Sequence, residues 1–97
     1  MNTKKPLNPS EAESIAISGF AYLANEPETL SRFLSITGVS PNELRDSIGQ
    51  PAFLVGVLDF FMSDEKTLLE FTEKQKINPE YIHIARQIIA GPENFEG

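Results

Sequence analysis

Histidine is the side chain most often used for proton transfer near neutral pH, and this sequence contains one, His83. His83 stands between Ile82 and Ile84 in a stretch with helical apolar spacing, and that spacing predicts an imidazole that faces outward. The sequence has no cysteine, no GxSxG or HExxH motif and no glycine-rich phosphate loop. We therefore assign no catalytic, cofactor-binding or metal-binding residue, and we expect neither an enzyme nor a cofactor.

A carboxylate within an apolar stretch is the remaining candidate for chemistry. Asp59 interrupts the apolar residues 52–62, where a raised pKa could make it an acid or a base. The structural alternative is that Asp59 pairs with Arg45 or Arg32, or caps the next helix. Two further acids, Asp64 and Glu65, suit the positive end of a helix dipole. We favour the structural interpretation and rank a carboxylate-based enzyme or metal binder around Asp59 third among the functions.

The charge balance argues against nucleic acid and anionic membranes. Fourteen acidic residues against eight basic ones give a net charge of −6. Proteins that bind phosphate backbones usually carry a basic face, because release of counterions drives that binding. The basic residues here are scattered rather than grouped: Lys4, Lys5, Arg32, Arg45, Lys66, Lys74, Lys76 and Arg86. We expect no membrane partner and no nucleic-acid partner.

A helix-turn-helix regulator is nevertheless the second function that the sequence suggests. Residues 30–49 could form two helices around a turn at Gly38, with Val39 and Leu44 packed inward. The second helix would expose a mixed set of side chains: Asn42, Glu43, Arg45, Asp46 and Gln50. A later stretch is more basic, with Lys74, Lys76, His83 and Arg86. The simpler interpretation is that Gly38 ends one helix of an ordinary antiparallel pair.

Prolines mark the expected helix starts, because proline suits the first turn of a helix. Five of the seven prolines follow a residue in the capping position: Asn8-Pro9, Glu26-Pro27, Ser40-Pro41, Gln50-Pro51 and Asn78-Pro79. Asn8 with Glu11, and Ser40 with Glu43, have the spacing of a capping box, whereas Glu26 and Gln50 are poor caps by type. Ser63 indicates a sixth start, and three glycines, Gly38, Gly49 and Gly91, indicate left-handed helix ends.

These signals predict helices near residues 9–25, 27–37, 41–48, 51–62, 64–76 and 79–90, and no window alternates like a strand. The fold class is all-α, a compact bundle of about six short helices. Residues 51–62 are apolar almost all round, which predicts the buried centre of the bundle. We expect one domain over 8–91, with loose tails at 1–7 and 92–97, although Phe95 could dock on the domain.

Two stretches, 20–45 and 58–83, align when the sequence is shifted by 38 residues. The shift matches Thr29 with Thr67, Phe33 with Phe71 and Pro41 with Pro79. One interpretation is two packed three-helix units, which would superpose on each other. The other is that any two helix pairs with similar spacing can be aligned. Both stay open at this point.

Several strings in the sequence resemble a known family. FAYLANEPETLSRFLSITGVSPNELR, PAFLVGVLDFFMSDEKTLLEF and NPEYI, which together span most of the chain, are similar to small alphaproteobacterial proteins of domain-of-unknown-function family 3572. The resemblance implies a short, helical, cytoplasmic bacterial protein. It implies no activity and no functional residue.

The sequence does not identify a function. The leading hypothesis is a non-enzymatic protein–protein interaction module or small adaptor, whose partner is another protein or a second copy in a homodimer. Aromatic residues are numerous for six short helices: Phe20, Tyr22, Phe53, Phe60, Phe61, Phe71 and Tyr81. They either fill the core or leave an apolar patch for a partner, and the acid excess suggests a basic partner. Lys4 and Lys5 are followed by no apolar run, so we expect no signal peptide and a cytoplasmic protein.

Overall fold

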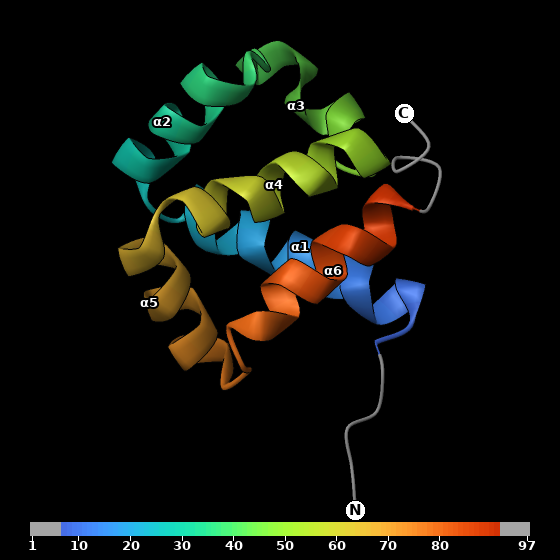
Figure 1. The fold of residues 1–97 in the computed structure, drawn as a ribbon. Helices are drawn as coiled ribbons and strands as arrows, with labels where there is room; N and C mark the ends of the chain where they lie inside the picture. Colours follow the sequence, from blue (N-terminus) through green and yellow to red (C-terminus); the bar gives the residue numbers. More distant parts are fainter. Residues whose placement is uncertain (1–6, 92–97) are drawn as a thin grey trace, which may run out of the picture.

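The computed structural model describes residues 7–91, and these residues form six α-helices and no strand (Figure 1). The helices are α1 (Pro9–Ala24), α2 (Pro27–Thr37), α3 (Pro41–Ser47), α4 (Pro51–Ser63), α5 (Glu65–Gln75) and α6 (Glu80–Ala90). The predicted all-α bundle of six helices is confirmed. The predicted tails and the docking of Phe95 lie outside the described residues, except that Leu7 packs against the core.

Side-chain hydrogen bonds cap some of the helix starts, whereas others have no such bond. At α1 the capping box is complete: Asn8 Oδ1 accepts from Glu11 N at 2.8 Å, and Glu11 Oε1 accepts from Asn8 N at 3.0 Å. At α3 the Ser40 N–H donates to Glu43 Oε1 at 3.3 Å. Glu26 before α2 and Gln50 before α4 make no capping hydrogen bond, as their residue types predict. The α2 and α4 starts therefore rest on their first-turn prolines.

The start of α5 differs from the prediction. Asp64, not Ser63, is the capping residue: its carboxylate accepts from the Thr67 N–H at 3.3 Å. The Ser63 hydroxyl instead donates to the Phe60 carbonyl at 2.9 Å, within the last turn of α4. At α6 the Asn78 side chain accepts from Glu80 N at 2.9 Å, which places the first helical residue one position later than predicted.

The helix ends also differ from the predicted pattern of glycines. Gly38 ends α2 in the left-handed conformation (φ 79°, ψ 7°), as expected. Gly91 has φ 82° but ψ 159°, which is not helical, and Gly49 is not among the residues with positive φ. The left-handed residue that the sequence did not predict is Lys76, with φ 59°, at the end of α5. A lysine in this conformation carries a steric cost that a glycine would not.

The core forms where α1, α4 and α6 pack against one another (Figure 1). The central helix is α4, which buries a continuous apolar face: Phe53, Leu54, Val57, Leu58, Phe60 and Phe61. It is not buried all round, because Ala52 is exposed and the Asp59 side chain is half exposed. The prediction of a buried central helix is therefore right for one face and wrong for the opposite one.

Most of the aromatic residues belong to this core. Phe33, Phe53, Phe60, Phe61 and Phe71 are buried, while Phe20, Tyr22 and Tyr81 are partly buried. Phe33 meets Phe53 and Phe60 edge to face, with ring centroids 5.6 Å apart in both pairs, a favoured aromatic geometry. The large apolar side chains that remain exposed in the described part of the chain are aliphatic: Ile17, Ile36 and Leu69.

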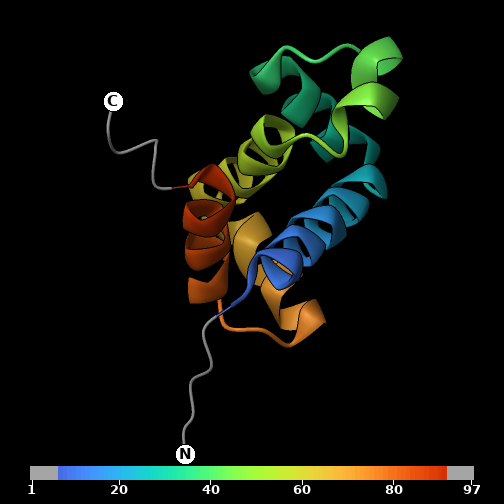
Figure 2. The ribbon, with the colours of Figure 1, turned by 90° about the vertical axis from the view of Figure 1, so that its right-hand side faces the viewer.

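The proposed repeat extends to only part of each half. α5 (Glu65–Gln75) is α2 (Pro27–Thr37) displaced by 38 residues at both ends, and the left-handed Gly38 and Lys76 correspond in the same way. The third helices differ, because α6 packs closely against α1 and α4 whereas α3 has no comparable helix partner within residues 7–91. Figure 2 shows α3 beyond the α1–α4–α6 core. We call α2 and α3 together the α2–α3 arm.

Two mid-helix glycines make a matched test of this packing. A Cβ on Gly19 would lie 2.8 Å from Phe61 Cε2, in a core ring that cannot move away freely, whereas a Cβ on Gly56 would meet Thr37 Cγ2 at an ordinary 3.7 Å. Alanine is a better helix former than glycine by about 1 kcal/mol. We expect Gly56→Ala to raise the free energy of unfolding by about 0.5–1 kcal/mol. We expect Gly19→Ala to lower it by about 1–3 kcal/mol, because overpacking exceeds the helical gain. Urea denaturation of the three proteins measures both, and a stabilised Gly19→Ala would contradict the close approach of α1 and α4.

Candidate functional site

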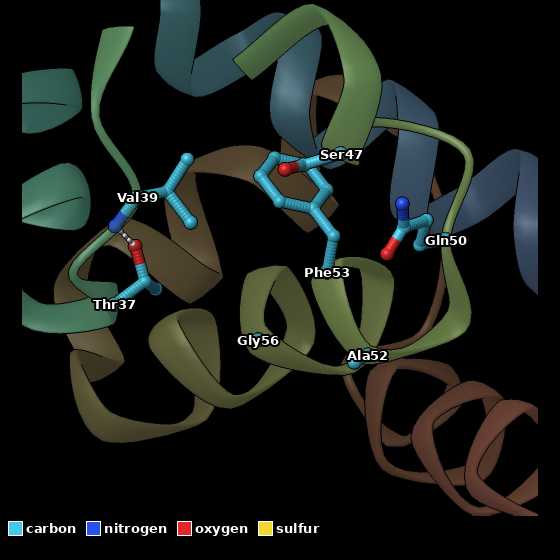
Figure 3. A pocket seen from close by; sticks show the side chains of 7 residues that line it. All are labelled: Thr37, Val39, Ser47, Gln50, Ala52, Phe53 and Gly56. Atoms are coloured by element: carbon cyan, nitrogen blue, oxygen red, sulfur yellow. Dashed lines mark hydrogen bonds between the residues drawn. The ribbon is translucent and has the colours of Figure 1, made fainter. Parts of the chain in front are cut away.

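A hollow of about 260 Å³ lies between the α2–α3 arm and the first half of α4 (Figure 3). We call it the arm hollow. Its lining residues come from the end of α2 and the turn after it, from the end of α3 and the turn after it, and from α4: Thr37, Val39, Ser47, Gln50, Ala52, Phe53 and Gly56. In Figure 3 the Val39 and Phe53 side chains point into the same space from opposite elements.

Local sequence explains why the arm stands away from α4 here. The left-handed Gly38 turns the chain sharply after α2, and Pro41 starts α3 three residues later. The Thr37 hydroxyl stiffens this turn, because it donates to the Phe33 carbonyl at 3.0 Å and accepts from Val39 N at 3.4 Å. On the facing surface of α4, the residue at position 56 is a glycine, so no side chain projects into the hollow there. Together the turn and the glycine leave the hollow open.

The three polar side chains of the arm hollow each donate a hydrogen bond to a backbone carbonyl of the chain. Thr37 bonds as described, the Ser47 hydroxyl donates to the Glu43 carbonyl at 3.0 Å, and Gln50 Nε2 donates to the Asp46 carbonyl at 3.2 Å. The remaining walls, Val39, Ala52, Phe53 and Gly56, are apolar.

The base of the arm hollow is the closely packed ring of Phe53. Phe53 is only 7% exposed, and its ring packs edge to face against Phe33 at 5.6 Å and Phe20 at 5.3 Å between centroids. These contacts hold the exposed edge of Phe53 in place. A fixed aromatic wall with few free hydrogen-bonding groups suits an apolar side chain better than a charged ligand.

A second hollow, of about 390 Å³, is lined mainly by charged and polar side chains: Tyr22, Glu26, Thr29, Arg32, Asp64, Lys66, Thr67 and Glu70. We call it the polar cleft. Arg32 forms an ion pair with Asp64 and lies over the Phe60 ring, 5.2 Å from its centroid. Lys66 pairs with Glu70 at 3.4 Å, and the Tyr22 hydroxyl donates to Glu70 at 3.2 Å. These pairings tie α1, α2 and α5 together.

The polar cleft shifts the pKa of two groups. The Thr67 backbone N–H, then the Thr67 hydroxyl and Arg32, lower the pKa of Asp64, against an opposing effect of partial burial. Partial burial, followed by the hydrogen bond to Glu70, raises the pKa of Tyr22. The Asp64 carboxylate therefore stays ionised and the Tyr22 hydroxyl stays protonated at neutral pH. Both states suit a structural network and neither is poised for proton transfer.

The carboxylates considered for chemistry do not come together. The predicted pairing of Asp59 with Arg45 or Arg32 is wrong. Asp59 instead pairs with Arg86 of α6, whose Nε donates to Oδ1 at 2.8 Å and whose Nη2 donates to Oδ2 at 3.4 Å. This hydrogen bond raises the pKa of Arg86. Asp64 faces Arg32 instead, and Glu65 is exposed. Within residues 7–91 no three His, Asp or Glu side chains converge as metal ligands do.

His83 is exposed, as predicted. Its Nδ1 lies 3.2 Å from the sulfur of Met62 on α4, and no carboxylate within residues 7–91 forms a hydrogen bond with its ring. The orienting group that a catalytic histidine usually has is thus not seen among the described residues.

The helix-turn-helix elements are present, with Val39 and Leu44 partly buried against the core. The residues expected on the outside of α3 are all exposed: Asn42, Glu43, Arg45, Asp46 and Gln50. In the more basic stretch, Lys74, Lys76 and His83 are exposed, but Arg86 is paired with Asp59. The stretch thus offers two lysines at the end of α5 and an arginine whose charge is already matched.

The comparisons with known proteins agree with the resemblance seen in the sequence. Residues 9–92 match the model of the family described as "Protein of unknown function (DUF3572)", which covers most of the chain. The chain belongs to this family. No curated protein and no solved structure matches it. The DUF3572 match includes every residue of the arm hollow and of the polar cleft. In the described part of this DUF3572 chain, no helix is both long and apolar enough to cross a membrane.

Sequence reasoning did not identify the arm hollow as a site. The sequence predicts Gln50 as a helix cap or DNA contact and Val39 as a core residue, and its apolar spacing predicts only that Thr37 faces inward. Gly56 was the one available clue, because a glycine in the middle of an apolar helix costs stability and so marks a missing side chain.

Removing the Asp64 cap should cost stability in a pH-dependent way. Because the pKa of Asp64 in the folded protein is lowered from 3.8, its carboxylate stabilises the fold above that pH. This contribution is lost as the pH falls through the folded-state pKa. We expect Asp64→Ala to lower the free energy of unfolding at pH 7 by about 1 kcal/mol, and the difference to shrink below about pH 4. Asp64→Asn, which retains a capping oxygen, should lose less. Equal stability of the wild type and Asp64→Ala at pH 7 would contradict this role.

The Asp59–Arg86 pair should contribute little. Both side chains are substantially exposed, at 47% and 37%, and solvent screens such pairs. We expect Asp59→Asn to change the free energy of unfolding by less than about 1 kcal/mol. Thermal unfolding followed by circular dichroism measures this, and a larger loss would mean that Asp59 has a structural role beyond the ion pair.

Proposed function

We propose that this protein is a non-enzymatic interaction module that holds one large apolar side chain of a partner protein in the arm hollow. The observation that carries the proposal is the hollow itself, which combines apolar walls, a closely packed phenylalanine and polar side chains whose donors bond within the chain. We also propose that the binding takes place in the cytoplasm of a bacterium.

The size of the arm hollow supports a side-chain anchor. Sites for cofactors and drug-sized ligands usually measure about 300–1,000 Å³. The arm hollow, at about 260 Å³, lies below this range. Protein interfaces commonly concentrate their binding energy in a few anchors that fill pockets of this kind. The exposed face of α3, which carries two acids and one arginine, also favours a protein partner over a phosphate backbone.

A hollow-filling variant tests the proposal. In Gly56→Leu the new side chain starts from a Cβ position with ordinary space and extends where the anchor would lie. Ala21→Leu is the matched control, because it adds a leucine at an exposed position of α1 that does not line the hollow. The measurement is an affinity pull-down of each tagged protein from lysate of its own host, read by mass spectrometry against a tag-only control.

We expect the wild type and Ala21→Leu to recover one partner protein in near-stoichiometric amount and Gly56→Leu to recover none of it. Circular dichroism should show that both variants are folded. Equal recovery by Gly56→Leu would rule out the arm hollow as the anchor site. Recovery of the protein alone would argue against an adaptor and in favour of self-association, which sedimentation velocity of the wild type and Gly56→Leu would then test.

A further inference from the structure

The charges beside the arm hollow are unevenly distributed around α3. Successive residues of an α-helix are separated by about 100° around the axis. Glu43 therefore lies one turn before Ser47 on the same side of α3, as the bond from the Ser47 hydroxyl to the Glu43 carbonyl also shows. Arg45 lies about 160° around the helix from Ser47. Asp46 lies about 100° from Ser47, at the flank of α3. Of the three charged side chains of α3, the two acids thus lie nearer than Arg45 to the side that faces the hollow.

No positive charge balances these acids from the other walls. Residues 51–58, the first half of α4, contain no charged side chain. Asp46, next to Ser47, is exposed and its carboxylate has no ion pair with any residue of the described chain. The Glu43 carboxylate accepts from the N–H of Ser40, the residue that follows Val39 of the lining, and this bond holds its charge at the start of α3.

Apart from Arg45 on α3, the cations of the described residues lie elsewhere. Arg32 and Lys66 are paired in the polar cleft, and Arg86 is paired with Asp59. Lys74 and Lys76 are at the end of α5, which lies on the opposite side of the molecule from α3 (Figure 1). The arm hollow is therefore an apolar recess whose nearest charged neighbours on α3 are acids, in a chain whose net charge is −6.

We infer that the partner's anchoring side chain is flanked by lysine or arginine residues. This inference rests on the proposed function, because it assumes that the hollow takes a partner's apolar side chain. An apolar recess supplies the contact area, and the acidic border adds electrostatic complementarity, which increases the association rate and discriminates against acidic competitors. The Asp46 carboxylate is the main contributor, since its charge is exposed and unpaired. Glu43 adds to the field while it caps α3.

Three short synthetic peptides test this inference. Each is blocked at both ends: one has a central phenylalanine between pairs of lysines, one has the same phenylalanine between pairs of glutamates, and one has a serine between pairs of lysines. Binding is followed by amide chemical shifts of the full isotope-labelled protein. We expect the lysine–phenylalanine peptide to shift the amides of Thr37, Ser47 and Gly56, and to bind at least about tenfold more tightly than the other two. The preference should weaken as salt rises above about 0.1 M, because the charges are exposed.

A pair of charge variants locates the effect. Asp46→Lys reverses the charge beside the hollow and leaves the backbone carbonyl that Gln50 contacts. Glu73→Lys makes the same change at an exposed position of α5. We expect Asp46→Lys to weaken the lysine–phenylalanine peptide about tenfold and Glu73→Lys to leave its affinity within about twofold.

The outcomes separate the two proposals. Equal binding of the two phenylalanine peptides overturns the basic partner and leaves the hollow as an apolar anchor site. Equal binding of the two lysine peptides, or no shift at the hollow amides with any peptide, overturns both. Equal weakening by Asp46→Lys and Glu73→Lys overturns the assignment to Asp46, because net charge alone would then account for binding.

Discussion

The close approach of α1 and α4 at Gly19 is the constraint on which the rest of the structure depends. The absence of a side chain at Gly19 lets Phe61 of α4 pack directly against the backbone of α1. That contact brings the two helices together, and α6 covers the surface they share. Phe71 stacks on Phe61 at 4.8 Å, so α5 is positioned through the same ring. A change at this crossing would therefore affect several helices at once.

The α2–α3 arm depends on this core at fewer points. Phe33 anchors α2 through its contacts with Phe53 and Phe60, and Leu44 and Ile48 give α3 partial burial. Because α3 has no closely packed helix partner in residues 7–91, space remains under the arm. The same arrangement thus gives a tightly packed side, where ion pairs are satisfied, and a loosely packed side with an apolar recess and uncompensated acids.

Much of the fold follows from signals that are local in sequence. The prolines, the Asn8–Glu11 box, Gly38 and the acids after Ser63 predict the bounds of the six helices to within one residue at each end. Partners that are distant in sequence are harder to predict. The sequence suggests Arg45 or Arg32 as the ion-pair partner of Asp59, but the partner is Arg86, because ion pairing depends on which helices become neighbours. The left-handed Lys76 went unpredicted, because no residue preference marks it. The arm hollow was missed because empty space depends on helix placement, and only Gly56 reflects it in the sequence.

The starts of α2 and α4, on either side of the α2–α3 arm, have no side-chain cap, since neither Glu26 nor Gln50 makes a capping hydrogen bond. A segment that begins at an uncapped helix start and packs on fewer helices than the core helices do can open while the α1–α4–α6 core stays folded. The arm would then be a separate cooperative unit, with amide protons that exchange through local opening. Each opening would uncover Phe53 and widen the recess, so the free energy of that opening would set how large a side chain the recess admits.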